Sequence, residues 1–327
     1  MIEPVGASRL FARVVSPIKI GRGWPGLAIL RVWGGLLCLL SGVAAAVGAE
    51  RADIHLHLKW SQLEVTSVAE AMVALQDNGI VLAGVIGTPP ELAQRLREAD
   101  PARVFAWYGP YSEARDWSRW YFDEDLPGRA RAAIASGAYR GIGELHLIGG
   151  FAPRWDTPVI EALLALSAEY RVPMLVHVEF SRADYLIGLC AQEPRARLLL
   201  AHGGAPMPPR ELRRALDACP NLWWELSARD PWRYVSSPIT DEAGTLRPEW
   251  RQLILDYSER LMLGSDPVWP VDQLDRWDEP DTGWQHLARF WKAHEAWLAQ
   301  IPEPAAGAIR LANAQRYFDL RSVDPGG

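Results

Sequence analysis

Short apolar segments rich in Val, Ile and Leu recur along the chain, separated by stretches that carry apolar residues at helical spacing. Apolar runs of about four to eight residues are typical of buried strands. Eight such segments lie at 53–58, 80–86, 104–107, 141–147, 174–178, 198–202, 222–226 and 261–264. Amphipathic patterns predict helices over 126–136, 158–170, 182–192, 208–218, 248–259 and 283–299.

Two further helices have clear start signals. Ser67 and Glu70 form a capping-box pattern at the start of a helix that extends to Asp77. Thr88, two prolines and Glu91 repeat the signal, with proline in the favoured first turn. Nearly every gap between strand segments therefore contains a predicted helix.

This alternation predicts a (β/α)₈ TIM barrel, because eight strands spaced about 25–40 residues apart with intervening helices are its signature. An open, doubly wound sheet is the alternative. That fold favours a glycine-rich turn after the first strand, whereas residues 57–62 are HLKWSQ. No repeat or linker indicates a second domain, so residues 50–327 are expected to form one barrel domain.

Residues 1–49 have the features of a targeting segment. Five basic residues and one acid occupy 1–31, an apolar run follows over 32–43, and Val47-Gly48-Ala49 precedes Glu50. This order predicts a secretory signal peptide cleaved before Glu50. An uncleaved membrane anchor over 27–49 and a buried helix are the alternatives. Export would permit a Cys190–Cys219 disulfide, although two unpaired core cysteines are equally compatible with the sequence.

Composition narrows the class of protein. With 49% apolar and 23% charged residues in 327, the chain is expected to fold around a core. Its net charge of −6 argues against a basic nucleic-acid-binding protein. Three cysteines are too few for a zinc ribbon.

The first strand segment carries unusual polar residues. Side chains alternate across a strand, so His55 and His57 point to one face, predicted to be the barrel interior. Ile54, Leu56 and Leu58 then face the helices. Two neighbouring imidazoles suggest a metal site, because neutral imidazole is a good ligand for cations such as Zn²⁺.

Ionisable residues also lie at the ends of other strand segments. Glu144, His177, His202 and Asp266 each lie at or near a carboxyl end, and active sites of α/β barrels are built on that face. Burying so many ionisable groups without a cation would be costly. Asp53 shares the histidine face lower in the barrel, and we expect it to support the ligands.

These residues together resemble the amidohydrolase superfamily of metal-dependent hydrolases, and its amidohydrolase-related group most closely. The matching motifs are DIHLHL, LVHV, LLAHGG, LGSD and the tail ANAQRYFDL, which is similar to the closing helix of that group. The resemblance covers residues 51–320 and implies a (β/α)₈ barrel that holds one or two divalent cations, with Zn²⁺ the expected ion.

The resemblance also assigns roles. His55, His57 and Asp266 match ligands of the more buried cation. His177 and His202 match ligands of a second cation; in one-metal members one of them often binds while the other contacts substrate. Glu144 replaces the carboxylated lysine of many two-metal members, and GELHL is similar to a strand of TatD-like metal nucleases. Glu144 either bridges two cations or orients a ligand histidine.

The resemblance implies a metal-activated water that cleaves an ester, lactone or amide bond of a small molecule. Asp266 would act as general acid and base, and His202 would hold the oxyanion if it is not a ligand. No GxSxG elbow or P-loop is present. The alternatives are a metal-dependent decarboxylase, a TatD-like nuclease, which the acidic chain disfavours, and a non-catalytic exported binding barrel, which should lack some ligands.

The sequence says less about the substrate. Loops after the third, seventh and eighth strand segments are aromatic and span 109–125, 228–244 and 267–284. Their rings either form walls for a flat or apolar substrate or only pack the loops onto the barrel. Arg182 and Arg233 either clamp a substrate carboxylate or are solvated, and His146 is either a substrate contact or solvated. Oligomeric state is not indicated.

Overall fold

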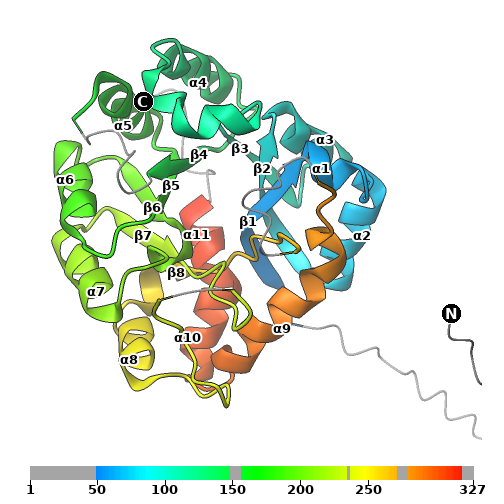
Figure 1. Cartoon of the computed structure of the whole chain (residues 1–327), viewed down its shortest axis with the longest axis vertical. Coiled ribbons are helices and arrows are strands. Elements are labelled where there is room, and N and C mark those ends of the chain that lie inside the picture. Colours follow the sequence, from blue (N-terminus) through cyan, green and yellow to red (C-terminus); the bar gives the residue numbers. More distant parts are fainter. Residues whose placement is uncertain (1–48, 148–155, 234–235, 271–278, 319–327) are drawn as a thin grey trace, which may run out of the picture. The chain divides into compact units, whose positions relative to one another are not determined.

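Eight parallel strands follow one another in chain order in the described part of the protein (Figure 1). The computed structural model describes residues 49–147, 156–233, 236–270 and 279–318. The strands are β1 (Arg51–Lys59), β2 (Ile80–Thr88), β3 (Val104–Tyr108), β4 (Gly141–Leu147), β5 (Pro173–Val178), β6 (Arg197–Leu200), β7 (Leu222–Glu225) and β8 (Leu261–Met262).

Backbone hydrogen bonds also join the first strand to the residues that follow the last one. The Ile54 amide donates to the Leu263 carbonyl at 3.0 Å, and the Asp266 amide donates to the His55 carbonyl at 2.8 Å. A Cβ atom on Gly264 would lie 2.4 Å from the His55 Cβ, so glycine permits this close approach. The sheet therefore closes, and the predicted (β/α)₈ barrel is confirmed.

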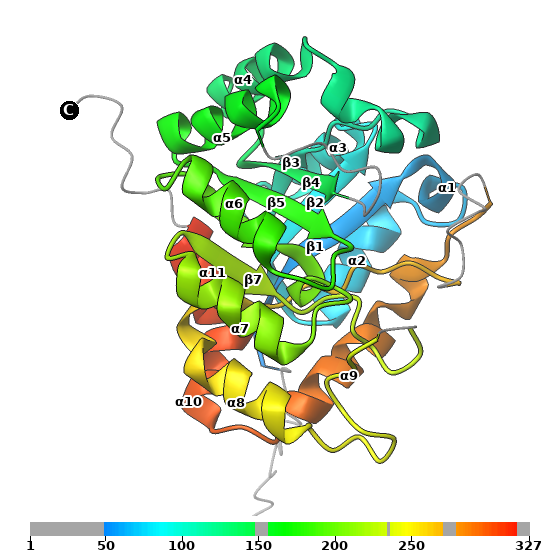
Figure 2. The same cartoon turned by 60° about the vertical axis from the view of Figure 1, so that its left-hand side comes forward.

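Helices surround the sheet, as Figures 1 and 2 show. The α-helices are α1 (Trp60–Leu63), α2 (Val68–Asp77), α3 (Glu91–Ala99), α4 (Leu126–Ala135), α5 (Pro158–Tyr170), α6 (Asp184–Gln192), α7 (Pro209–Ala218), α8 (Pro248–Asp256), α9 (Leu287–Leu298), α10 (Glu303–Gly307) and α11 (Asn313–Phe318). The predicted capping box of α2 is present: the Glu70 amide donates to Ser67 Oγ, and the Ser67 amide donates to Glu70 Oε2.

Some predicted boundaries are wrong where the backbone turns toward the open end of the barrel. β6 was expected to reach residue 202, but it ends at Leu200 and a short 3₁₀ helix, η3 (Ala201–Gly203), follows. β8 was expected to reach Gly264, but it ends at Met262. β8 pairs with β7 only as far as Met262, and left-handed φ angles at His202 and Asp266 depart from strand geometry after β6 and β8.

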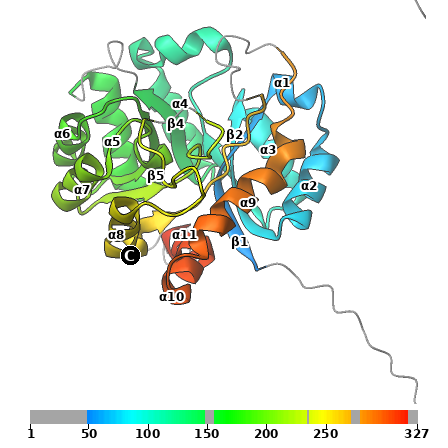
Figure 3. The same ribbon diagram turned by 60° about the horizontal axis from the view of Figure 1, so that its bottom comes forward.

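Apolar packing closes the opposite end of the barrel. One cluster joins Ala52 and Ile54 of β1 with Phe105 of β3 and Phe318 of α11. The Phe318 ring lies 4.5 Å from that of Phe105, centroid to centroid. Figure 3 shows α11 beside the start of β1. The closing helix is therefore confirmed, and it packs at the end where the strands begin.

The face assigned to Ile54 needs correction. Leu56 and Leu58 lie in the larger cluster with residues of the surrounding helices, as predicted. Ile54 instead packs in the second cluster, near Phe105 and Phe318. The register against β2 shifts between Asp53 and Leu56, so strict alternation fails there.

Two observations bear on the predicted export. Cys190 of α6 and Cys219, just after α7, form a disulfide, which settles the choice that the sequence left open. The signal or anchor segment itself, except for Ala49, lies outside the described residues. Within the described ranges, no helix is both long enough and apolar enough to cross a bilayer.

Candidate metal centre

Glu144, at the inner face of β4, lies at the centre of the site. Its side chain is 3% exposed. Oε1 lies 3.1 Å from His177 Nδ1 and 3.0 Å from His202 Nε2. Oε2 lies 3.4 Å from the Nε2 atoms of His55 and His57. One carboxylate therefore contacts four histidines from three different strand ends.

Asp266 completes the predicted set, with Oδ1 3.5 Å from His57 Nε2. The structure thus brings together all six residues that the sequence nominated. Ligand atoms of these six residues and of His146 fall into overlapping groups whose atoms lie within 4.8 Å of one another: His55, His57 and Asp266; His55, Glu144 and His202; and Glu144, His146 and His177.

The donor set fits divalent cations such as zinc. It consists of imidazole nitrogens and carboxylate oxygens, the ligands that these ions take in proteins. His55 Nε2 and His57 Nε2 lie 3.1 Å apart, and His202 Nε2 lies 3.0 Å from His177 Nδ1. Nitrogens that face each other this closely must share a proton or a cation, because two bare lone pairs would repel.

The backbone is specialised where it presents these groups. His202 and Asp266 have φ angles of 55° and 43°, in the left-handed region that non-glycine residues rarely adopt. Gly143, directly before Glu144, has φ 130°, and a Cβ there would lie 2.5 Å from the Leu175 carbonyl oxygen. Such strain is typical of functional sites, where the surrounding fold maintains it.

Sequence reasoning missed Glu225, the last residue of β7. It is fully buried, and Oε1 accepts hydrogen bonds from His55 Nδ1 at 3.0 Å and from the His202 amide at 2.8 Å. Because His55 donates through Nδ1, its Nε2 lone pair faces Glu144. The signal was available, since Glu225 also lies at the carboxyl end of a predicted strand.

Ser227 fixes the tautomer of His202 in a similar way. Its hydroxyl donates to Glu225 Oε1 at 2.9 Å and lies 2.7 Å from His202 Nδ1. Since the single hydroxyl proton is used on Glu225, the oxygen accepts from the Nδ1–H of His202. His202 therefore also turns an Nε2 lone pair toward Glu144, as a metal ligand requires.

Electrostatics keep Glu144 ionised. Burial alone would raise its pKa, but the surrounding histidines, His55 before the others, hold the pKa well below its usual value. Burial opposes charge on His177 too, yet its hydrogen bonds to Glu144 and Glu179 raise its pKa to about 9. Without a cation, the site therefore gathers protons around Glu144.

Arg233 was expected either to clamp a substrate carboxylate or to be solvated, and it is not solvated. Its side chain is 13% exposed, and Nη1 donates to Asp266 Oδ2 at 2.7 Å. Nη2 donates to the Asp266 carbonyl, and Nε lies 3.0 Å from Asp230 Oδ2. Arg233 thus holds Asp266 from two sides. Arg182 is 74% exposed and pairs with Asp184, so it is solvated.

Two other predicted residues are buried. Asp53 accepts hydrogen bonds from the Ser265 amide and Trp291 Nε1, each at 3.0 Å, and so joins β1 to the residues after β8. Burial raises the pKa of Asp53 to about 7. His146 is 4% exposed, so it is not solvated either, and its Nε2 lies 3.6 Å from Glu144 Oε2.

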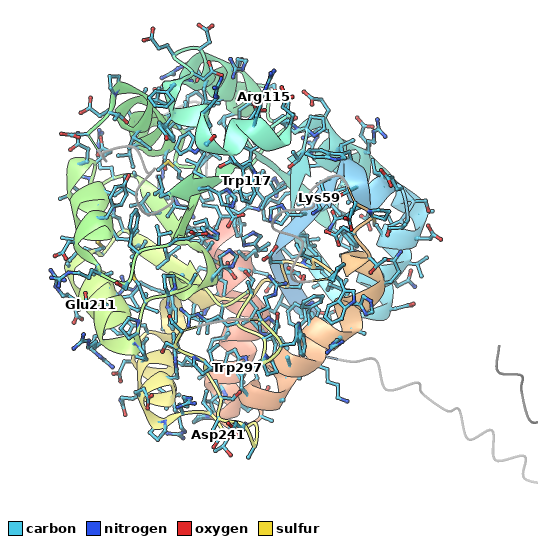
Figure 4. All side chains as sticks on the ribbon, viewed as in Figure 1. Lys59, Arg115, Trp117, Glu211, Asp241 and Trp297 are labelled. Carbon is cyan, nitrogen blue, oxygen red and sulfur yellow. A yellow bond between two sulfur atoms is a disulfide. The ribbon has the colours of Figure 1, made fainter. Side chains whose placement is uncertain are left out.

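The aromatic loops contact the site. Trp117 stacks on His146, whereas Arg115 of the same short helix lies farther out (Figure 4). The ring centroids of Trp232 and Trp269 each lie 4.4 Å from the Arg289 guanidinium carbon. Arg289 therefore links the loop after β7 to the loop after β8. Part of this aromatic set therefore packs the loops together, and part of it faces the ligand cluster.

Comparison with known proteins agrees with this architecture. The profile of the amidohydrolase family matches residues 52–320. A search of curated proteins finds no match.

Solved structures share the fold. A probable 2-pyrone-4,6-dicarboxylic acid hydrolase from Acinetobacter baumannii is 14% identical, with a TM-score of 0.55. A 2,6-dihydroxybenzoate decarboxylase complexed with 2,6-dihydroxybenzoate is 13% identical, with a TM-score of 0.53. A zinc-bound amidohydrolase from Burkholderia multivorans is 16% identical, with a TM-score of 0.52. Each match covers 83% of this chain and 99% of the other.

Proposed function

Since this chain belongs to the amidohydrolase family, and is therefore an enzyme of the metal-dependent hydrolase type, we propose that it hydrolyses an ester, lactone or amide bond of a small molecule. The observation that carries the proposal is the position of Glu144, whose carboxylate contacts four histidines at 3.0–3.4 Å. A buried carboxylate surrounded by imidazoles is well suited to join two cations.

The ligands divide into two groups. His55, His57 and Asp266 would hold one cation, and His177 and His202 would hold a second, with Glu144 between the two. Zinc or a similar ion would polarise the scissile carbonyl and lower the pKa of a water molecule to about 7. The hydrogen bond between His202 and Ser227 supports a ligand role for His202 rather than an oxyanion-binding role, because it leaves no proton on Nε2.

Asp266 is the proposed general base and acid. The Arg233 guanidinium and nearby histidines outweigh burial and keep its pKa below the usual value, so its carboxylate is ionised at neutral pH. Arg233 engages Oδ2, while Oδ1 faces His57. This arrangement leaves Asp266 oriented to take a proton from water and to pass it to the leaving group.

Decarboxylation of an aromatic acid is the second candidate. It is favoured by the fold shared with the dihydroxybenzoate decarboxylase and by the Trp117–His146 stack beside the site, which suits a flat substrate. Loss of carbon dioxide from an aromatic acid, without ester, lactone or amide hydrolysis, would favour this candidate.

The test begins with protein purified without chelator. We expect at least one transition metal ion per chain by elemental analysis, loss of activity on chelation and recovery with Zn²⁺ or Mn²⁺. Activity would be followed on aryl esters, lactones, amides and aromatic acids. A content well below one metal ion per chain, with turnover that chelation does not change, would refute the proposal.

We also propose that the chain is exported through residues 1–49. The Cys190–Cys219 disulfide supports export, because disulfides persist mainly in oxidising compartments. Expression of the full chain in a bacterial host, followed by mass spectrometry of the exported fraction, should find Glu50 at the N-terminus. A full-length chain in the membrane fraction would indicate an anchor instead.

A further inference from the structure

His146 is contacted by neighbouring residues on both its ring and its backbone. Its imidazole stacks on Trp117 with ring centroids 3.8 Å apart and planes at 26°, and the ring of His177 lies 4.6 Å away. Trp120 Nε1 donates to the His146 carbonyl at 3.2 Å. The ring and the backbone of His146 are therefore both fixed by the loop after β3.

Tyr111, from the same loop, determines which ring nitrogen carries the proton. Its hydroxyl oxygen accepts from the His146 amide at 2.8 Å and lies 3.0 Å from His146 Nδ1. Tyr111 is 3% exposed, and among the described residues these are the two hydrogen-bond partners of its hydroxyl. The buried O–H must donate to an acceptor, and within the described part of the chain Nδ1 is the acceptor in reach.

If Nδ1 accepts from Tyr111, the proton of a neutral His146 lies on Nε2. That atom is 3.6 Å from Glu144 Oε2, which is longer than a hydrogen bond, so among the described residues its N–H has no acceptor and is available to a bound molecule. His55 and His202 present the opposite tautomer, with lone pairs on Nε2. The site thus combines nitrogens arranged to bind a cation with one arranged to donate a hydrogen bond.

We propose that His146 is a catalytic residue whose Nε2–H donates a hydrogen bond to the substrate carbonyl oxygen as negative charge develops there. Tyr111 is then a positioning residue that fixes the tautomer of His146. The inference rests on the proposed function for its catalytic part, since it assigns the oxyanion-stabilising group of that reaction.

The tautomer can be tested without any substrate. Zn²⁺-loaded protein labelled with ¹⁵N-histidine would be examined by long-range ¹H–¹⁵N correlation, with the His146 signals assigned by their absence in His146→Phe. We expect an Nε2–H imidazole in the wild type and a loss of this preference in Tyr111→Phe. An Nδ1–H imidazole in the wild type would overturn the inference whether or not the protein is a hydrolase.

Kinetics and metal content test the catalytic part. Phenylalanine keeps a ring against Trp117, and the double variant His146→Phe/Tyr111→Phe leaves no buried hydroxyl without an acceptor. On an aryl ester, we expect kcat to fall about 10²–10³-fold with little change in KM and with wild-type Zn²⁺ stoichiometry. His146→Gln should restore part of kcat, because its amide N–H reaches the position of Nε2.

Two results would contradict this role. Loss of one Zn²⁺ per chain in His146→Phe would make His146 a ligand, and an unchanged kcat would remove it from catalysis. If wild-type protein turned over none of the substrates, the proposed function would fail, while the tautomer measurement would still decide how Tyr111 sets His146.

Discussion

His55 Nδ1 donates a hydrogen bond to Glu225 Oε1 at 3.0 Å, so a carboxylate at the end of β7 orients an imidazole on β1. The same oxygen accepts a hydrogen bond from the His202 amide. It also accepts one from the Ser227 hydroxyl, whose oxygen contacts Nδ1 of the His202 ring. Partners of this kind fix the tautomer of a ligand histidine and raise its basicity. Glu225 therefore controls ligands on two strands without facing the metal centre itself.

Glu225→Gln should weaken metal binding. Glutamine can still accept from His55, but its NH₂ group would meet the Ser227 amide, which donates to Oε2 at 2.5 Å in the native site. We expect Zn²⁺ affinity about 10–100-fold lower, with unchanged stoichiometry at saturating metal. Competition titration against a chromophoric chelator measures both quantities.

Glu249→Gln is the matched control, because Glu249 lies exposed in the first turn of α8. It should bind Zn²⁺ as the wild type does. Equal affinities in Glu225→Gln and Glu249→Gln would show that the hydrogen bond to His55 does not contribute to metal binding.

Asp266→Asn should abolish most turnover while the fold is retained. Asparagine is nearly isosteric and can accept from Arg233 Nη1, but it cannot take a proton from water. We expect kcat to fall by at least about 10²-fold in metal-replete protein, the contribution of general base catalysis alone. The variant would be checked by elemental analysis and circular dichroism; a wild-type kcat would remove Asp266 from the mechanism.

The barrel and the ligand set could be predicted because both depend on periodic patterns. Alternation along a strand places His55 and His57 on one face, and active sites of α/β barrels lie at carboxyl strand ends, where Glu144 and His177 also occur. These rules need no knowledge of distances between loops. Glu225 also lies at the carboxyl end of a strand. It was missed because it follows two tryptophans in a segment interpreted only as part of the core.

The contacts made by loop residues could not be predicted, because they depend on loop conformations that follow no periodic pattern. Tyr111 reaches His146 from the loop after β3, and Arg233 reaches Asp266 from the loop after β7. The sequence marks these loops as aromatic, but it does not indicate which of their side chains reach the ligand cluster. The left-handed backbone at His202 was not predicted either, because most histidines have a negative φ even though the type is enriched at positive φ.

Asp230 should give the protein a pH-dependent loss of stability. Burial raises its pKa to about 6, despite the opposing charge of Arg233. Between about pH 4 and 6 the folded protein retains a proton that the unfolded chain has released, so stability falls as pH rises through this window. Relative to Asp230→Asn, wild type should lose about 3 kcal/mol of unfolding free energy across it.

Urea unfolding of both metal-free proteins at a series of pH values measures this difference. Asp77→Asn, at an exposed position on α2, controls for loss of one surface carboxylate. If wild type and Asp230→Asn respond to pH in parallel, Asp230 does not hold a proton in the folded state.

The Cys190–Cys219 disulfide closes a loop with a sequence separation of 29 residues and should stabilise the barrel. We expect Cys219→Ala to lower the free energy of unfolding by about 3 kcal/mol, mainly because the unfolded chain gains freedom. Reducing the wild type should produce a similar loss, and the variant should not respond to reductant. If reductant left the unfolding free energy of the wild type unchanged, the disulfide would not be stabilising.

Glu144→Gln should decide how many cations the site holds. If Glu144 bridges, its two oxygens serve different ions, because Oε1 faces His177 and His202 whereas Oε2 faces His55 and His57. A glutamine presents only one oxygen, so one ion should be lost and the other should remain on His55, His57 and Asp266. We therefore expect two Zn²⁺ per chain in the wild type and one in the variant.

If Glu144 only orients histidines, the same change should weaken binding about 10–100-fold and leave the stoichiometry at saturation unchanged. Titrating both proteins to saturation and counting bound Zn²⁺ separates these cases. Equal stoichiometry would exclude the bridge and favour a one-metal enzyme. That result would favour decarboxylation over hydrolysis, because decarboxylation needs no second cation to activate water. The metal counts of the two proteins therefore test the ligand assignment, while the substrate screen decides between the two candidate reactions.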